Sequence, residues 1–188
     1  MLGKLMGFFG RRSGNREIVD RLHQAVVEAA RRPAFYAQWG VPDTLDGRFD
    51  CVTLHAVLLM QRMQALPKPA DELANDVVDR LFLGFEEALR ELGVGDVVIP
   101  KRMKTIAAAF LGRAKAYEEG MKAAAEEGGG EGGEEVLAAV LRRNLLGEQA
   151  SLAQQRFWLD YLGQVSAALS LCDLDRIIRA DHLFPDPA

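Results

Sequence analysis

The chain of 188 residues is long enough to bury one proper hydrophobic core and short for two domains. Apolar residues make up 49 % and charged residues 27 %, a balance that excludes an intrinsically disordered chain and is typical of a globular protein. The formal net charge of −4 disfavours nucleic acid as the main partner, so no DNA-binding role is predicted.

Residues 1–15 form a first segment whose charge differs from that of the rest of the chain. Residues 1–16 contain four basic residues and no acid, so they carry +4 and leave −8 on the remainder. The apolar part of this segment precedes its Arg11–Arg12 pair, the reverse of a secretory signal, so export is not expected. We expect the segment either to lie on an anionic membrane surface or to be a disordered start.

Apolar residues recur at helical spacing through most of the remaining chain. Strand-like alternation is absent, except for a brief stretch at 97–99, and a short aromatic segment occupies 34–40. Asp71 and Glu72 suit the start of a helix, Gly93 suits a helix end, and Pro100 suits a first turn. The predicted helices span residues 16–32, about 49–66, 70–92, 100 to about 126, 134–146, about 149–172 and a short stretch at 173–178.

The glycine-rich run at 128–133 is predicted to be a flexible connector, because it lacks the flanking features of a phosphate-binding loop. Two cysteines, Cys51 and Cys172, are too few for a disulfide framework and favour a reducing cytosol. No apolar run reaches the ~20 residues of a membrane span. The sequence therefore predicts an all-α fold, a single compact domain of about six to seven helices over residues 16–188.

The stretch "GVPDTLDGRFDCVTLH", residues 40–55, holds the densest group of chemically capable side chains. Cys51 and His55 lie four residues apart and would share one helical face, as a nucleophile and its base would. A small enzyme that uses this pair, or the cluster of Asp43, Asp50 and His55, is therefore one hypothesis. Cys51 and His55 are too few ligands for a metal site and the spacing fails the calcium-loop pattern, so no metal is predicted.

A structural interpretation accounts for more of this stretch. Asp43, Thr44 or Asp46 can cap the helix that follows, Gly47 relaxes the backbone, and Arg48 can pair with a carboxylate. Caps do not explain the aromatic residues around the stretch, which are Phe35, Tyr36, Trp39 and Phe49. Aromatic residues, arginine and fixed turns together favour a recognition surface.

The helix predicted from residue 100 carries a basic face. Lys101, Lys104 and Lys115 share this face, with Ala108 and Gly112 between them. A glycine inside a helix costs about 1 kcal/mol relative to alanine, so Gly112 is expected to permit a close approach. The approaching group is either a neighbouring helix or a partner, and the lysines are equally a solvated face. A module that binds RNA or the ribosome through this patch is a further hypothesis.

Two blocks, "FYAQWGVPDTLDGRFDCVTLHAVLL" and "LRELGVGDVVIPKRMKTIAAAFLGRAKAY", resemble the ubiquinol–cytochrome c chaperone family over about residues 33–120. The residues that carry the resemblance are Trp39, Gly40, Asp43, Thr44, Gly47, Arg48, Phe49, Asp50, His55, Arg90, Glu91, Gly93, Gly95, Asp96, Lys101, Arg102, Phe110, Gly112, Arg113 and Tyr117. Leu111 stands where the family usually has an aromatic residue. The C-terminal third matches only in being helical and in an "RNL" near Asn144.

The resemblance implies a non-enzymatic factor, with no cofactor, that binds newly made cytochrome b and supports the assembly of complex III. Mitochondrial members of the family also associate with a small partner protein and with the ribosome. No mitochondrial presequence precedes the domain, which favours the alphaproteobacterial form. We therefore expect a cytoplasmic protein, or one peripheral on the inner face of the cytoplasmic membrane.

The surface expected to hold this client combines aromatic and charged residues from two regions, 35–50 and 96–117. Its members are Phe35, Tyr36, Trp39, Asp43, Arg48, Phe49, Asp50, Asp96, Lys101, Arg102, Lys104 and Arg113. Asp96 and Arg113 are the two that we expect to form an internal ion pair or turn bond instead. The glycines expected to serve turns and packing are Gly40, Gly47, Gly93, Gly95 and Gly112.

Overall fold

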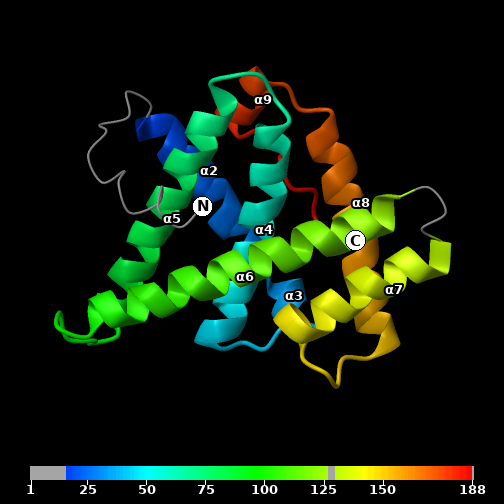
Figure 1. Ribbon diagram of the computed structural model, residues 1–188, viewed down its shortest axis with the longest axis horizontal. Helices are drawn as coiled ribbons and strands as arrows, with labels where there is room; N and C mark the ends of the chain where they lie inside the picture. Colours follow the sequence, from blue (N-terminus) through cyan, green and yellow to red (C-terminus); the bar gives the residue numbers. More distant parts are fainter. Residues whose placement is uncertain (1–15, 127–129, 188) are drawn as a thin grey trace.

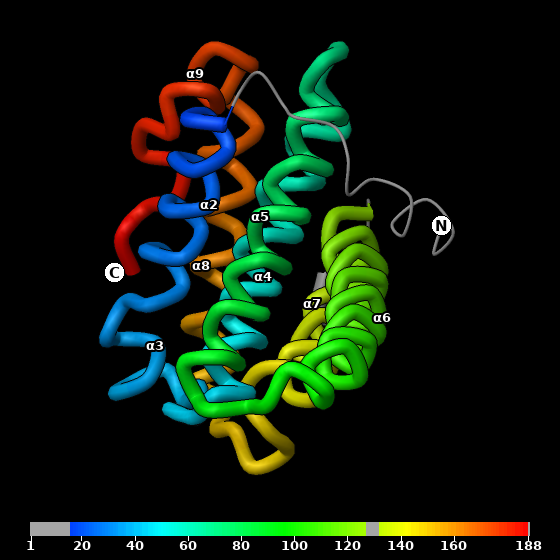
Figure 2. The backbone as a smooth tube through the Cα atoms, turned by 90° about the vertical axis from the view of Figure 1, so that its left-hand side faces the viewer, coloured from blue at the N-terminus to red at the C-terminus, as the bar shows by residue number. Residues whose placement is uncertain are grey.

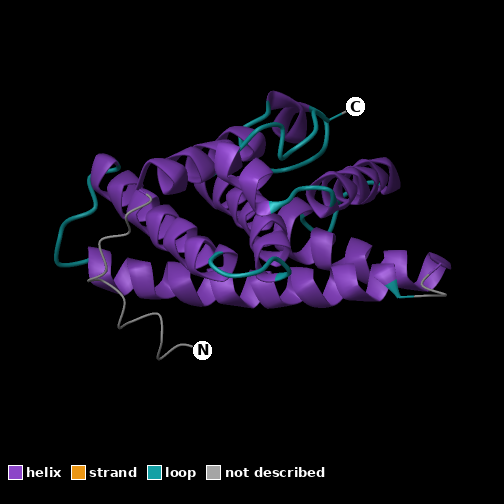
Figure 3. Ribbon diagram, turned by 90° about the horizontal axis from the view of Figure 1, so that it is seen from above, coloured by secondary structure: helices purple, strands orange, loops and turns teal. Residues whose placement is uncertain are grey.

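The structure is a computed structural model that describes residues 16–126 and 130–187. Within these ranges the chain forms only helices and the turns between them, as Figure 3 shows, so the predicted all-α fold is confirmed. The predicted membrane-surface or disordered segment, residues 1–15, lies outside the described residues.

Six helices of 12 or more residues make up most of the described chain, in the order drawn in Figure 1. In chain order the elements are α2 (Arg16–Ala30), α3 (Pro33–Ala37), α4 (Leu45–Gln64), α5 (Ala70–Glu91), α6 (Ile99–Ala125), α7 (Gly130–Leu141), a π-helical turn η1 (Arg142–Leu146), α8 (Leu152–Ser170) and α9 (Leu174–Arg179). None of the described helices is long and apolar enough to cross a membrane.

Local sequence signals set several helix starts. Of the three candidate caps before α4, Thr44 is the N-cap, and its hydroxyl oxygen accepts a hydrogen bond from the Gly47 N–H at 3.1 Å. Ser151 and Gln154 form a reciprocal capping box at the start of α8. Asp173 caps α9 through its carboxylate, which accepts a hydrogen bond from the Arg176 N–H at 2.8 Å.

The helices are arranged in two layers around one core. Helices α2, α4, α5 and α8 form the larger layer, and α6 and α7 lie side by side as a second layer, which is seen edge-on in Figure 2. Helix α4 is the central element, and every residue from Leu54 to Leu59 is buried. Along this stretch the helix is therefore enclosed by its neighbours on all sides.

The structure differs from the predicted elements in three places. The aromatic segment after Pro33 is the short helix α3, and residues 97–98 precede α6 without forming a strand. Residues 130–133 are helical, although the glycine-rich run was predicted to be a connector. A Cβ at Gly133 would lie 2.4 Å from the Ala123 carbonyl oxygen, so glycine here lets α7 approach α6 closely.

Candidate functional site

Phe35 stands at the centre of an aromatic cluster in the core. Its ring centroid lies 5.2 Å from that of Trp39, 4.7 Å from that of Trp158 and 5.2 Å from that of Tyr161. Phe35 is 0 % exposed and Trp39 is 4 % exposed. The prediction that these two side chains lie on a binding surface is therefore wrong, because α8 supplies aromatic partners that cover them.

His55 is buried beside this cluster and is held in one tautomer. Its Nδ1 lies 2.8 Å from the Cys51 carbonyl oxygen, which can only accept, so Nδ1 carries the proton. Its Nε2 then accepts from the Tyr161 hydroxyl at 2.9 Å, and Arg32 donates to that hydroxyl at 3.3 Å. Burial lowers the pKa of His55 to about 4, so the imidazole is neutral at physiological pH.

The geometry does not form the nucleophile–base pair that the sequence suggested. Cys51 is buried, and burial raises the pKa of its thiol. Its Sγ lies 3.9 Å from His55 Nδ1, a nitrogen whose proton is already donated to the Cys51 carbonyl. Asp43 and Asp50 pair with arginines elsewhere and do not reach His55. Among the described residues, no group of three or more His, Cys, Asp or Glu side chains could hold a metal ion.

Arg32 ties the C-terminal tail to this buried network, a contact that the sequence did not predict. Its guanidinium donates hydrogen bonds to the carbonyl oxygens of Phe184, at 2.7 Å, and Pro185. Asp186 adds an ion pair at 3.3 Å, and the Phe184 ring lies 5.3 Å from the His55 ring. The only sequence signal for this contact was the tail "HLFPDPA", whose aromatic residue and prolines suit an extended segment packed on the core.

The difference in unfolding free energy between the wild-type protein and His55→Gln is expected to shrink by about 2 kcal/mol between pH 7 and pH 5. In the unfolded chain the imidazole binds a proton below its ordinary pKa of 6.5, whereas the buried imidazole stays neutral down to about 4. The folded state binds fewer protons in this window, so the contribution of His55 falls as the pH falls. Urea unfolding of both proteins at each pH gives the difference.

Comparing two proteins removes the effect of other groups, notably Asp50. Burial raises the pKa of Asp50 to about 6, so its own contribution has the opposite pH dependence and is common to both proteins. A difference that stayed constant from pH 7 to pH 5 would show that His55 is not buried as a neutral group.

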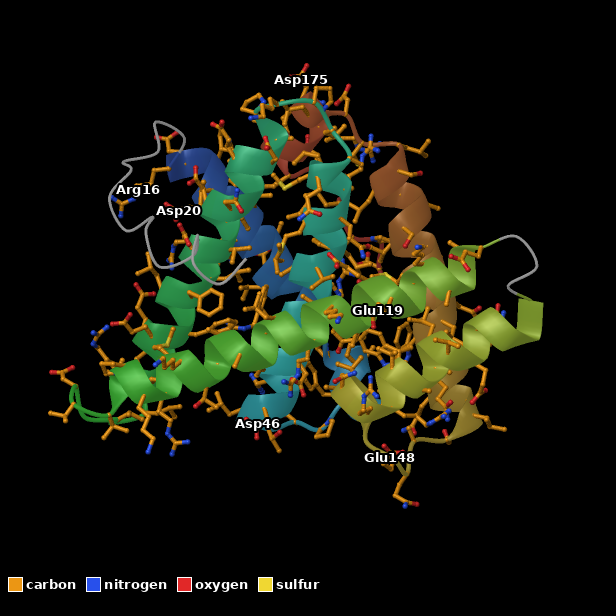
Figure 4. All side chains as sticks on the ribbon, in the orientation of Figure 1. Arg16, Asp20, Asp46, Glu119, Glu148 and Asp175 are labelled. Carbon is orange, nitrogen blue, oxygen red and sulfur yellow. The ribbon has the colours of Figure 1, made fainter. Side chains whose placement is uncertain are left out.

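Tyr36, Asp43 and Arg48 remain at the surface, where α3 meets the start of α4. Arg48 Nε lies 2.8 Å from Asp43 Oδ1, and the guanidinium carbon lies 5.6 Å from the centre of the Tyr36 ring. These three line an open depression of about 370 Å³ together with Arg31, Pro33 and Ala37. The depression is close to the end of α4 that Asp46 marks in Figure 4.

Phe49, Asp50 and Arg113 form a second, half-buried group that joins α4 to α6. Arg113 Nε lies 2.5 Å from Asp50 Oδ1, a close ion pair whose N–H is not aligned as a hydrogen bond. The Arg113 guanidinium also lies 5.2 Å from the centre of the Phe49 ring, which packs against Phe85. The predicted internal ion pair of Arg113 is confirmed, and its partner Asp50 serves helix packing.

The remaining predicted site residues lie at the corner where α5 turns into α6. Asp96 pairs with Arg90 at 3.6 Å, but its side chain is 89 % exposed, so this is a surface pair and not the internal ion pair expected of Asp96. Lys101, Arg102 and Lys104 are exposed on the first turns of α6. The structure thus divides the predicted surface into three separate groups and a buried aromatic pair.

The five predicted glycines serve different purposes. Gly40 and Gly93 have φ values of +82° and +78°, a left-handed backbone that glycine adopts without strain. A Cβ at Gly47 would lie 2.0 Å from the Pro42 carbonyl oxygen, whereas Cβ atoms at Gly95 and Gly112 would meet no atom of the described residues within 4 Å. None of the described helices therefore packs against Gly112, and the docking of a partner there stays a prediction.

Comparisons with known proteins identify a family for this helical domain. The profile of the ubiquinol–cytochrome C chaperone family matches residues 37–184, which includes the C-terminal helices α8 and α9. Over 148 residues the chain is 24 % identical to ubiquinol–cytochrome-c reductase complex assembly factor 1 of Xenopus laevis, covering 77 % of this chain and 70 % of that protein.

A solved structure has the same fold. The crystal structure of the Cbp3 homologue from Brucella abortus superposes with a TM-score of 0.77 at 33 % sequence identity, covering 92 % of this chain and 91 % of that one. Sequence and fold agree over most of the chain. The chain therefore belongs to the ubiquinol–cytochrome c chaperone family.

Proposed function

We propose that this protein is an assembly factor for ubiquinol–cytochrome c reductase, complex III, that binds newly made cytochrome b without catalysing a reaction. The family match supports the assembly role, because it covers the domain from the end of α3 to Phe184 in the C-terminal tail. The burial of Cys51 and His55 in packing and hydrogen bonds supports a binding protein over an enzyme. We further propose that it works at the membrane surface, where a membrane-embedded client is inserted.

The surface proposed to contact the client is the depression beside Arg48. The Arg48–Asp43 ion pair is more than half exposed on both sides, and exposed pairs contribute little to stability, typically about 0–1 kcal/mol. Folding alone therefore gives little reason for this arrangement. A guanidinium held over a tyrosine ring, with an open depression beside it, suits recognition of a polar loop, since arginine and tyrosine are enriched among residues that dominate binding energy.

Arg48→Ala is expected to reduce the capture of cytochrome b about tenfold or more in a pull-down from gently solubilised native membranes. The reason is the loss of the guanidinium at the centre of the proposed contact. Cytochrome b in the eluate is quantified by immunoblot and by its haem absorbance. Thermal unfolding of the variant is expected to change little, because the side chain is exposed.

Arg179→Ala is the matched control. Arg179 forms a similarly exposed ion pair, with Asp181 at 3.6 Å, on the short helix α9. Its removal is expected to leave capture unchanged. Equal capture by Arg48→Ala and the wild type would contradict the proposed surface, and no capture by the wild-type protein would contradict the proposed client.

A further inference from the structure

The corner between α5 and α6 presents bare apolar side chains. Val97 is 94 % exposed, Leu92 is 61 % exposed and Val98 is 46 % exposed. Figure 1 shows this corner at the lower left, where it projects beyond the body of the molecule. Apolar side chains gathered at a projecting tip gain nothing from folding, because the described residues do not cover them.

Basic residues follow this tip directly. Residues 97–117 contain five basic residues and no acid, so they carry +5 in a chain whose net charge is −4. Two of the five are paired, Arg113 with Asp50 and Lys115 with Glu119, the latter at 3.7 Å; Glu119 is labelled on α6 in Figure 4. Within the described ranges Lys101, Arg102 and Lys104 have no ion-pair partner.

Most of the acidic residues of the corner already form ion pairs with nearby arginines. Arg90 lies 2.5 Å from Glu86 and 3.6 Å from Asp96, so one guanidinium serves two carboxylates. Glu87 pairs with Arg80 at 3.5 Å, which leaves Glu91 as the one carboxylate of 86–96 without a recorded ion pair among the described residues. The positive charges of Lys101, Arg102 and Lys104 therefore dominate the electrostatic potential at the tip.

These cations oppose the local stability of α6. The N-terminal end of a helix carries a partial positive charge, which favours acidic side chains and disfavours basic ones. The first turn of α6 has no acidic residue, and its N-cap Val98 makes no side-chain cap hydrogen bond. Neither helix formation nor core packing explains why apolar and basic residues meet at this point.

We propose that the α5–α6 corner docks on an anionic lipid bilayer. Val97, Val98 and Leu92 enter the headgroup region, and the side chains of Lys101, Arg102 and Lys104 reach lipid phosphates, the arrangement of a peripheral membrane contact. Outside residues 1–16, which carry +4, and residues 97–117, the chain carries −13, so this acidic body is repelled by the same bilayer and the corner turns toward it. This inference rests on the proposed action at the membrane surface and specifies which surface makes the contact.

A fluorescent label at Val97 tests the insertion directly. Both native cysteines are buried, so a thiol-reactive nitrobenzoxadiazole group attaches selectively to Val97→Cys in the full chain. With phosphatidylcholine–phosphatidylglycerol vesicles we expect the emission to rise and shift to the blue, and with pure phosphatidylcholine vesicles to stay unchanged. The matched control is Leu171→Cys, whose side chain is 78 % exposed at the end of α8 and is expected to stay in water.

Vesicle sedimentation tests the basic residues. Lys101→Gln with Lys104→Gln is expected to weaken binding to anionic vesicles about 30-fold at low salt, because each lysine near such a surface contributes about 1 kcal/mol. Lys115→Gln with Lys122→Gln is the matched control, since these lysines pair with Glu119 and Glu126 farther along α6. It is expected to bind several-fold more tightly than the first variant.

Several results would overturn the proposal. One is a label at Val97→Cys that stays in water while the protein sediments with anionic vesicles. Another is an equal loss of vesicle binding in the two lysine variants, and a third is a wild-type protein that does not sediment with these vesicles. A label that responds to solubilised membrane proteins and not to vesicles would show a protein contact instead. Cytochrome b capture from detergent extracts by the Lys101→Gln, Lys104→Gln variant separates the proposed client from the proposed membrane contact. Retained capture with lost vesicle binding supports both proposals. Lost capture with intact vesicle binding contradicts the membrane contact.

Discussion

Replacing Phe35 with alanine is expected to lower the free energy of unfolding by about 3–5 kcal/mol. The ring is completely buried between Trp39, Trp158 and Tyr161, so its removal leaves a cavity that three large rings cannot fill without leaving their own positions. Urea unfolding followed by tryptophan fluorescence measures the change, since both neighbouring tryptophans report on the same cluster.

Phe157→Ala is the matched control for this measurement. Phe157 stacks on Trp39, with ring planes 7° apart, but its side chain is 43 % exposed. The same chemical change should therefore cost less than half as much. Similar losses in the two variants would show that Phe35 is not enclosed, and would return Phe35 and Trp39 to the candidate surface.

Gly47→Ala is expected to destabilise the protein by about 3 kcal/mol, an effect of overpacking. The added Cβ would lie 2.0 Å from the carbonyl oxygen of Pro42, a backbone atom that no rotamer change can move. Relief requires the loop before α4 to shift, and the cap from Thr44 to the Gly47 N–H shifts with it. Chemical denaturation monitored by circular dichroism gives the value.

Gly112→Ala is the matched control, with an expected effect of the opposite sign. Gly112 is an exposed residue inside α6, and an added Cβ would meet no atom within 4 Å in the part of the chain that the structure describes. Alanine stabilises an exposed helix interior by about 0.5–1 kcal/mol relative to glycine. A loss of stability in Gly112→Ala, or an unchanged stability in Gly47→Ala, would contradict the backbone geometry at that position.

The sequence predicted the elements whose signals are local. Asp71 and Glu72, Gly93 and Pro100 placed α5 and the start of α6 within one residue, because charge, backbone freedom and a missing N–H act within a single turn. For the glycine-rich run at 128–133, local signals gave the wrong prediction for residues 130–133, which are helical. Glycine favours loops in isolation, but at Gly133 the close approach of α6 requires it in a helix.

The candidate site was harder to predict because burial depends on partners far along the chain. Phe35 and Trp39 read as surface aromatics until Trp158 and Tyr161, more than 115 residues later, cover them. The same holds for His55, whose buried Nε2 accepts a hydrogen bond from Tyr161, 106 residues later. By contrast, Arg113 was correctly assigned to an internal ion pair. The turn at Gly93 that ends α5 was also predictable, because its signal is local.

The clasp between Arg32 and the carbonyl groups of Phe184 and Pro185 has a consequence for biosynthesis. A ribosome makes the chain from the N-terminus, so Phe35, Trp39 and His55 emerge long before the residues that enclose them. Until α8 and the tail have left the exit tunnel, the aromatic faces of α3 and α4 have no cover. The native core of this protein therefore closes only after α8 and residues 184–185, which enclose these side chains, have left the exit tunnel.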